Sequence, residues 1–372
     1  MPDSNFDKAS LAWGIPWDAT WVTSIAFLGA SRRLAAANNF GQILIWDLPE
    51  QADAPLPAPV RHLDGHTNGI TALAASPDGR RLYSSSYDRT VRVWDLEAPT
   101  TGTAEIILNP RARDAAAKAK KPLPETPPIT VAVQQAERVI DIHKEWVRSL
   151  VLSKDGTQLL TGDDTGLAIL WEAPAMKEVR RIQGQTWLQA LALSGDKQLG
   201  VTCEYWPRSD ERPNSIRFWD LATGEVKHDL SKQITGGYNR TQCIVTAAFS
   251  PDDKQVALGV GGGDSGAKIY VVDVASGKKV REVPGLHVSA MTYLLFHPDG
   301  KHLFSCGRDT VVRIWQLSDW KPIKELGKRR GSDFDGYSWI HAVSLSADGL
   351  WLAAADMGGQ VQVWSMPPAT MN

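Results

Sequence analysis

Residues 63–96, LDGHTNGITALAASPDGRRLYSSSYDRTVRVWDL, decide the fold of this chain. Two runs and the closing segment Val91–Trp94 alternate between apolar or β-branched residues and smaller or polar ones. This alternation is typical of strands that bury one face. The Ser-Pro-Asp-Gly sequence at 76–79 and the Asp-Arg-Thr sequence at 88–90 supply tight turns between the strands. The stretch therefore predicts three antiparallel strands, with a fourth before the next Gly-His position.

The Gly65-His66 pair and the Trp94-Asp95 pair resemble the signature of the WD-repeat family, whose units are about 40–45 residues long. The resemblance implies that four side chains of a unit form a hydrogen-bonded tetrad inside it. Here they are His66, Ser84, Asp88 and Trp94, separated by 18, 4 and 6 residues. The same intervals recur in His287, Ser305, Asp309 and Trp315. A third unit keeps His143, Thr161 and Trp171, with Asp164 one place early.

Seven copies of the unit follow one another along the chain. The pairs that close the third strands are Trp46-Asp47, Trp94-Asp95, Trp171-Glu172, Trp219-Asp220, Val272-Asp273, Trp315-Gln316 and Trp364-Ser365. The turns between the first two strands begin at Leu28, Ser76, Ser153, Ser194, Ser250, His297 and Ser346. Repeats of this period must pack against their neighbours. The sequence therefore predicts an all-β, seven-bladed β-propeller of four-stranded antiparallel blades, with residues 1–372 as a single propeller.

The last blade needs a strand from elsewhere. The chain stops eight residues after Trp364, which is too few for another strand. The leading residues Lys8–Trp13 precede the first unit, and members of the family commonly close the ring with such a segment. We therefore expect the N-terminal strand to close the last blade.

The largest insertion lies at residues 97–137, within the second blade. The interval from Trp94 to Trp171 is 77 residues, against 48 from Trp46 to Trp94. The inserted segment contains an Ala/Lys run followed by prolines, which favours a flexible excursion. A docking arm is the functional alternative. Arg138–Ile142 is then expected to be the outer strand of the second blade.

Composition excludes several classes of protein. The chain has 372 residues, of which 43% are hydrophobic and 22% charged, and its formal charge is −2. It shows no apolar run long enough to span a membrane and no secretory signal. Cys203, Cys243 and Cys306 are not closely spaced, which argues against disulfides and zinc. We expect a cytoplasmic protein with no cofactor, no metal, and no nucleic acid or membrane partner.

Two columns of residues point to an interaction surface. Residues seven places before each turn are Trp21, Gly69, Trp146, Trp187, Cys243, Ala290 and Trp339. Residues two places further on are Thr23, Thr71, Arg148, Gln189, Val245, Thr292 and His341. Tyr87 and Arg308 are expected at the same rim, each just before a tetrad aspartate. By resemblance, this rim lies on the face where family members usually bind partners, and Trp is enriched in binding hot spots.

The alternative is that the tryptophans only cap the blades. We favour binding, and the predicted partner-binding residues are Trp21, Trp146, Trp187, Trp339, Tyr87, Arg148, Arg308 and His341.

Three functions remain open at this stage. The favoured one is a non-catalytic protein-interaction scaffold that docks a peptide or protein on the Trp-bearing face, as a monomeric propeller within a larger complex. The second is a module that binds a small ligand, a sugar or a cation, at the mouth of the central channel. The third is an enzyme built on the inserted loops around Glu204, Asp210 and Arg212. His66, Ser84 and Asp88 match a catalytic triad by type, but their place in the repeat implies burial rather than catalysis.

Overall fold

The structure of the chain is a computed structural model. It describes residues 5–15, 17, 21–51, 54–55, 58–108, 127–205, 215–234, 243–261, 267–287, 290–328 and 339–367. The strands of these residues form seven sheets, which are the blades of an all-β, seven-bladed propeller, as the sequence predicts. The chain divides into two compact units, Asp141–Arg329 and the combination of Pro2–Ile140 with Arg330–Asn372.

The unit Asp141–Arg329 contains blades 3 to 6, each a four-stranded antiparallel sheet in chain order. Blade 3 holds β12 (Val147–Leu152), β13 (Gln158–Asp163), β14 (Leu167–Glu172) and β15 (Lys177–Gln183). Blade 4 holds β16 (Trp187–Leu193), β17 (Leu199–Tyr205), β18 (Ile216–Asp220) and β19 (Val226–Asp229), followed by the short helix α2 (Ser231–Ile234). Blade 5 holds β20 (Cys243–Phe249), β21 (Gln255–Gly261), β22 (Ala267–Asp273) and β23 (Lys278–Gly285). Blade 6 holds β24 (Met291–Phe296), β25 (His302–Gly307), β26 (Val311–Gln316) and β27 (Lys321–Gly327).

The second unit contains blades 7, 1 and 2. Blade 7 holds β28 (Ile340–Leu345), β29 (Trp351–Asp356), β30 (Val361–Ser365) and β1 (Ser10–Ile15), which follows the 3₁₀ turn η1 (Phe6–Lys8). Blade 1 holds β2 (Val22–Phe27), β3 (Arg33–Asn38), β4 (Ile43–Asp47), β5 (Arg61–Asp64), β10 (Ile129–Gln135) and β9 (Gly102–Ile106). Blade 2 holds β6 (Ile70–Ala75), β7 (Arg81–Ser86), β8 (Val91–Asp95) and β11 (Arg138–Ile140).

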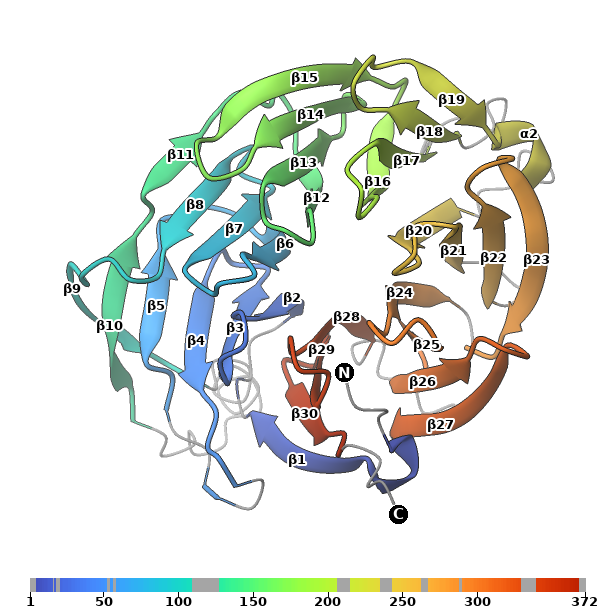
Figure 1. Cartoon of the computed structure of the whole chain (residues 1–372). Helices are drawn as coiled ribbons and strands as arrows, with labels where there is room; N and C mark the ends of the chain where they lie inside the picture. The colour runs from blue at the N-terminus through green and yellow to red at the C-terminus, as the bar shows by residue number, and fades with distance from the viewer. Residues whose placement is uncertain are drawn as a thin grey trace, which may run out of the picture. The chain divides into compact units, whose positions relative to one another are not determined.

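The expected closure of the last blade is confirmed. Figure 1 shows β1, in blue, alongside β30, in red, and the two strands pair antiparallel. Leu11 lies opposite Trp364, and Trp13 lies opposite Val363. Trp13 also stacks on Trp351, with ring centroids 5.0 Å apart.

The insertion differs from the flexible segment that the sequence predicts at 97–137. Its two ends form β9 and β10, an antiparallel pair. β10 also pairs parallel with β5, so the sheet of blade 1 has six strands. Ile106 and Val131 of this pair are buried in one cluster with Trp13 and Trp17, which supplies the apolar contact that orders them. Residues 109–126, with the Ala/Lys run, lie outside the described residues. β11 follows, and it is the outer strand of blade 2 at the expected place.

One turn, repeated between the first and second strands of the blades, explains much of their regularity. In five blades a serine hydroxyl donates to the aspartate two residues later, at 2.5–2.7 Å. The same hydroxyl oxygen accepts the backbone N–H that opens the second strand, at 2.9–3.0 Å. These serines are Ser76, Ser153, Ser194, Ser250 and Ser346. The turn thus satisfies its own polar groups before the strands meet.

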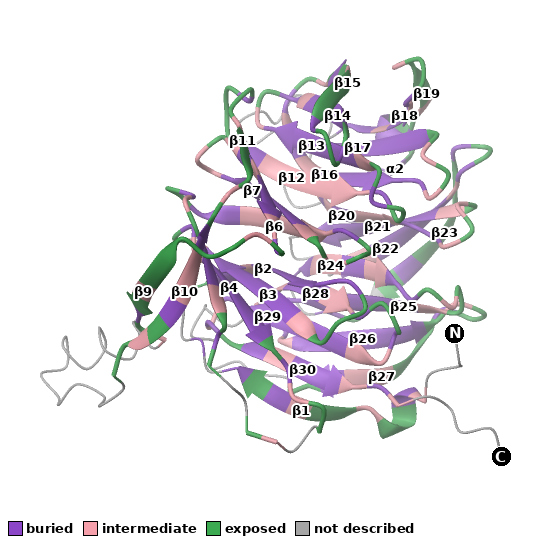
Figure 2. Ribbon diagram, turned by 60° about the vertical axis from the view of Figure 1, so that its left-hand side comes forward, coloured by how far each residue is buried: buried purple, intermediate pink, exposed green. Residues whose placement is uncertain are grey.

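The core lies between neighbouring sheets of the same unit. Ala35, Ile43 and Ile45 of blade 1 share one buried cluster with Leu82 and Trp94 of blade 2. Figure 2 shows the result as buried inner strands, while exposed residues gather on outermost strands such as β9 and β15. Within the described residues, no helix has the length and apolar character required to cross a bilayer.

Candidate interaction rim and the buried tetrads

The first strand of every blade carries a β-bulge near its start. In each case the pairing with the second strand skips one residue, for instance between Val22 and Ser24. The skipped residues are Thr23, Thr71, Arg148, Gln189, Val245, Thr292 and His341. They are the second sequence column, and all of them are partly exposed. Because a bulge re-aims the side chain that it carries, the fold presents a variable residue at one end of each blade.

Four of the seven bulged side chains make hydrogen bonds of two kinds. The hydroxyl groups of Thr23, Thr71 and Thr292 contact Ala37, Ser85 and Cys306 in the second strand of the same blade. These threonines therefore stabilise their own blade. Arg148 instead reaches into the turn after β13, where it binds Asp164.

The first sequence column lies at or just before the start of each first strand. Trp146 is 44% exposed and Trp21 is 37% exposed, whereas Trp187 and Trp339 are only partly exposed. Gly69 and Ala290 are buried. Two of the four tryptophans are therefore exposed where their first strands begin.

Backbone hydrogen bonds fix Tyr87 and Arg308 beside this column. The N–H of Tyr87 donates to the carbonyl of Gly69 at 2.9 Å, and the N–H of Arg308 donates to that of Ala290 at 3.0 Å. Asp164 occupies the matching place in blade 3, because its N–H donates to Trp146 at 3.2 Å. We call the ends of the blades that carry these residues the rim.

A connected group of side chains lies at the rim of blades 3 and 4. The guanidinium of Arg148 donates two hydrogen bonds to Asp164, at 2.6 and 2.7 Å, and both side chains are largely buried. The guanidinium carbon also lies 4.6 Å from the ring centroid of Trp187. The ring of Trp187 also lies near the ring of Tyr205, with their centroids 6.4 Å apart. Two bonds and a cation–π contact thus hold Arg148 in one orientation, next to the exposed Trp146.

The rim of blade 1 has an aromatic residue that the sequence did not single out. Phe40 is 62% exposed and lies in the turn between β3 and β4. Its neighbour Asn39 donates its N–H to the carbonyl of Trp21 at 3.1 Å, which brings the two aromatic residues to the same end of the blade. The signal available in the sequence was an aromatic residue in a turn that otherwise favours polar ones.

Cys243 and Arg308 lie close enough at the rim of blades 5 and 6 to interact electrostatically. Burial raises the pKa of the Cys243 thiol and lowers the pKa of Arg308. A thiol whose charged form is disfavoured is a poor nucleophile. This pair therefore gives no support to catalysis.

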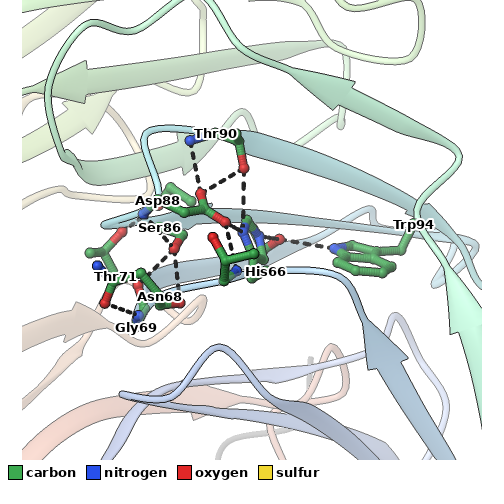
Figure 3. A network of polar contacts seen from close by, with 11 residues as sticks. His66, Asn68, Gly69, Thr71, Ser86, Asp88, Thr90 and Trp94 are labelled. Atoms are coloured by element: carbon green, nitrogen blue, oxygen red, sulfur yellow. Dashed lines mark hydrogen bonds and ion pairs between the residues drawn. The ribbon is translucent and has the colours of Figure 1, made fainter.

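The structure brings the blade 2 tetrad together (Figure 3). Trp94 donates its indole N–H to Ser84 Oγ at 2.9 Å, and His66 Nε2 lies 2.7 Å from the same oxygen. His66 Nδ1 lies 2.7 Å from Asp88 Oδ2, and Asp88 Oδ1 accepts the N–H and hydroxyl of Thr90. Burial would raise the pKa of Asp88, but its hydrogen bonds to His66 and Thr90 outweigh burial and hold the pKa well below the usual range. Burial lowers the pKa of His66.

The blade 6 tetrad has the same geometry. Trp315 donates to Ser305 Oγ at 2.7 Å, and His287 lies 2.7 Å from Ser305 Oγ and 2.8 Å from Asp309 Oδ1. The fully buried Arg313 adds a bond of 2.7 Å to Asp309. Ser84 and Ser305 are likewise fully buried and bonded to indole groups. A substrate has no access to these hydroxyls, so the triad of residue types in each tetrad serves structure.

In blade 3 the tetrad aspartate is Asp163, and the prediction of Asp164 was wrong. The carboxylate that meets His143 Nδ1 belongs to Asp163, at 2.9 Å, and not to Asp164. His143 Nε2 lies 2.9 Å from Thr161 Oγ1, which accepts the indole N–H of Trp171 at 3.0 Å. Asp163 accepts the N–H and hydroxyl of Thr165, as Asp88 does with Thr90. Asp164 instead lies at the rim, where it binds Arg148.

Blade 4 has buried polar contacts in place of a histidine tetrad. Trp219 donates to Thr202 Oγ1 at 2.8 Å, and the buried Glu204 binds Arg217 at 2.6 Å. Burial raises the pKa of Glu204, against the bonds from backbone N–H groups and the charge of Arg217. Glu204 thus takes a structural place, which removes it from the enzyme site considered from sequence. Asp210 and Arg212 lie outside the described residues.

Comparison with known proteins agrees with this geometry. The family model described as "WD domain, G-beta repeat" matches residues 57–95, 134–172, 277–316 and 327–365. Three of these matches cover the blades that hold a histidine tetrad. The chain is similar to the small ribosomal subunit protein RACK1y of Oryza sativa subsp. japonica, with 27% identity over 82% of this chain and 80% of that protein. It is also similar to the small ribosomal subunit protein RACK1 of Caenorhabditis elegans, with 24% identity over 80% of this chain and 93% of that protein. The target of rapamycin complex subunit wat1 of Schizosaccharomyces pombe is 25% identical over 77% of this chain and 61% of its own length.

Proposed function

We propose that this chain, a WD-repeat β-propeller protein, is a non-catalytic scaffold that docks a protein or peptide on its rim. The main support for this proposal is the exposed side chain of Trp146. Trp146 is 44% exposed, and its carbonyl accepts the N–H of Asp164. Asp164 and Trp187 in turn fix the orientation of Arg148. A large aromatic surface on a rigid base loses little entropy on binding and is typical of a hot spot.

The similar proteins support a role within an assembly. Their names place the RACK1 proteins in the small ribosomal subunit and wat1 in the target of rapamycin complex. At 24–27% identity most side chains differ between this chain and these relatives, so the partners of the relatives are not assigned to its rim. We infer a cytoplasmic, monomeric propeller within a larger complex, with a protein partner rather than nucleic acid or a membrane.

The unit Pro2–Ile140 with Arg330–Asn372 offers its own rim residues. Trp21 and Phe40 are exposed at the end of blade 1, and Tyr87, Trp339 and His341 are partly exposed on blades 2 and 7. We assign these residues to partner binding by the same reasoning. Arg308 is the corresponding residue of blade 6.

A small cation as the ligand is less favoured. Stacking a cation on a ring requires an open aromatic face. Arg148 already lies over the ring of Trp187. A ligand of this kind would have to displace an arginine that two hydrogen bonds hold in place.

The test compares two exposed apolar residues of blade 3. Trp146→Ala removes the rim indole, and Val179→Ala removes a side chain that is 51% exposed on the outer strand β15. Wild type and both variants are used as baits in a lysate of the native host, and the captured proteins are quantified by mass spectrometry. We expect Trp146→Ala to lose at least one protein that the wild type and Val179→Ala retain. Identical capture by all three baits would contradict docking at Trp146.

A further inference from the structure

The turn between β24 and β25 in blade 6 differs chemically from its counterparts. His297 takes the place of the serine found in five other blades, and His302 opens the following strand. Asp299 lies between them in the turn. The three possible ligand atoms lie within 4.8 Å of one another. We propose that His297, Asp299 and His302 form a binding site for a divalent transition-metal ion of the Zn²⁺ class.

The two imidazoles converge on one carboxylate oxygen. His297 Nδ1 lies 3.0 Å from Asp299 Oδ2, and His302 Nδ1 lies 2.7 Å from the same oxygen. The other oxygen, Oδ1, accepts the backbone N–H groups of Lys301 and His302 at 2.7 and 3.1 Å. The backbone therefore orients the carboxylate so that Oδ2 faces both rings.

The donor set suits a metal of this class. Two imidazole nitrogens and one carboxylate oxygen are common ligands of Zn²⁺, and three protein ligands leave a position for water. The exposed fractions of the side chains are 1% for His297, 7% for Asp299 and 16% for His302. The site is thus partly desolvated, with His302 on its solvent side. A bound ion would replace the proton between His302 Nδ1 and the carboxylate. It would also replace the long contact of 3.2 Å in which His297 Nδ1 accepts the Asp299 N–H.

The fold holds the ligands in place without an ion. His297 is packed against the ring of Phe304, with centroids 5.9 Å apart. The planes of His297 and His302 are nearly perpendicular, at 81°. Five other blades form the same turn with serine and no histidine pair, so the turn does not depend on metal. A preformed set of ligands reduces the ordering cost of binding.

The site is independent of the proposed docking surface. It lies at the end of β24, whereas Ala290 and Arg308 mark the rim at the other end of blade 6. No metal site is predicted from the sequence, because His-x-Asp-x₂-His matches none of the usual spacings of metal ligands. Failure of the docking proposal would therefore leave the metal proposal intact, and the reverse also holds.

The neighbouring blades supply substitutions that the turn tolerates. His297→Ser introduces the residue found in Ser153 and Ser250, and His302→Gln introduces the residue found in Gln158 and Gln255. Each variant removes one ligand while keeping a side chain that the same turn already accommodates elsewhere. His341→Gln is the control, because it removes a histidine from blade 7 and introduces the residue that blade 4 has at the same bulge.

Full-length protein freed of metal with a chelator is titrated with ZnCl₂ in a calorimeter, and with CoCl₂ in a spectrophotometer. We expect one ion per chain in the wild type and in His341→Gln, with visible Co²⁺ bands from nitrogen and oxygen ligands. His297→Ser and His302→Gln should each weaken binding by at least about 10-fold. Added Zn²⁺ should raise the melting temperature of the wild type and not that of these two variants.

Two outcomes would overturn the proposal. One is a wild type that binds neither ion. The other is metal binding that does not depend on the two histidines. This would be seen if His297→Ser and His302→Gln bound the ions as tightly as the wild type, or if His341→Gln weakened binding as much as they do. Melting temperatures measured without metal show whether each variant is folded, so loss of binding and loss of structure are separated.

Discussion

The guanidinium of Arg148 in blade 3 lies over the ring of Trp187 in blade 4, 4.6 Å from its centroid. The same guanidinium is bonded twice to Asp164. One side chain thus joins the bulge of one blade, the turn beside it and the first strand of the next blade. A residue from a variable column has become part of the contact between two repeats.

This contact should be measurable as a coupling energy. In a double-mutant cycle, Arg148→Ala and Trp187→Ala should couple by about 0.5–2 kcal/mol in the free energy of unfolding, because the cation–π contact is partly desolvated. Denaturant unfolding of the four proteins gives this quantity. The matched control is Arg181→Ala, which removes an arginine from the exposed ion pair with Glu178 and should have little effect on the free energy of unfolding. A coupling energy of zero would show that Arg148 and Trp187 do not stabilise each other.

Loss of the tetrad carboxylate should be costly. Asp88→Ala leaves His66 Nδ1 and the N–H of Thr90 without their acceptor in a buried place. We expect the free energy of unfolding to fall by about 1–3 kcal/mol. Asp64→Ala, at an exposed aspartate at the end of β5, is the control and should have little effect. If both variants unfold at the same denaturant concentration as the wild type, the tetrad does not contribute to stability.

Local patterns explain what the sequence predicts well. The blades, the closing strand and the tetrads around His66 and His287 all depend on spacings within one repeat or on the ends of the chain. Asp163 was missed because two adjacent aspartates follow Thr161, and only the conformation of the turn decides which one meets His143.

Long-range pairing explains what the sequence misses. β10 pairs parallel with β5, about seventy residues earlier, and an Ala/Lys and Pro-rich neighbourhood gives no sign of this partner. The bulges were also missed, because period-2 alternation does not reveal a skipped pairing. The grouping of His297 with His302 depends on a turn whose geometry, rather than its motif, brings them together.

Acid should destabilise the protein in two steps. Burial lowers the pKa of His66 and of His287, so the unfolded chain binds protons more readily than the folded chain below about pH 6.5. The stability from these neutral histidines is present above that pH and is lost as the pH falls, by at most about 1.4 kcal/mol per pH unit for each. Asp88 and Asp309 also have lowered pKa values, despite the opposing effect of burial, because of their bonds to the histidines. Their contribution is lost only below about pH 4.

The histidine step is checked by denaturant unfolding at several pH values between 7 and 5. The His66→Gln/His287→Gln double variant should be less stable at pH 7 and show a shallower decline than the wild type. Burial also lowers the pKa of His62, so the decline should not vanish. Equal slopes in both proteins would mean that the tetrad histidines do not govern this step.

Trp13 is the largest buried side chain of the closing strand β1. Trp13 is 5% exposed, stacks on Trp351 and donates its indole N–H to the carbonyl of Ala54 at 3.2 Å. Trp13→Ala should lower the free energy of unfolding by about 3–5 kcal/mol, because it leaves a cavity between β1 and the neighbouring blade. Hydrogen exchange should also show faster exchange in β30, which loses its outer partner when β1 detaches. The control is Leu11→Ala, because Leu11 lies on the same strand and is 56% exposed. This substitution should alter neither the free energy of unfolding nor the exchange in β30 appreciably. Equal effects of the two substitutions would mean that backbone pairing, rather than packing of Trp13, holds β1 in blade 7.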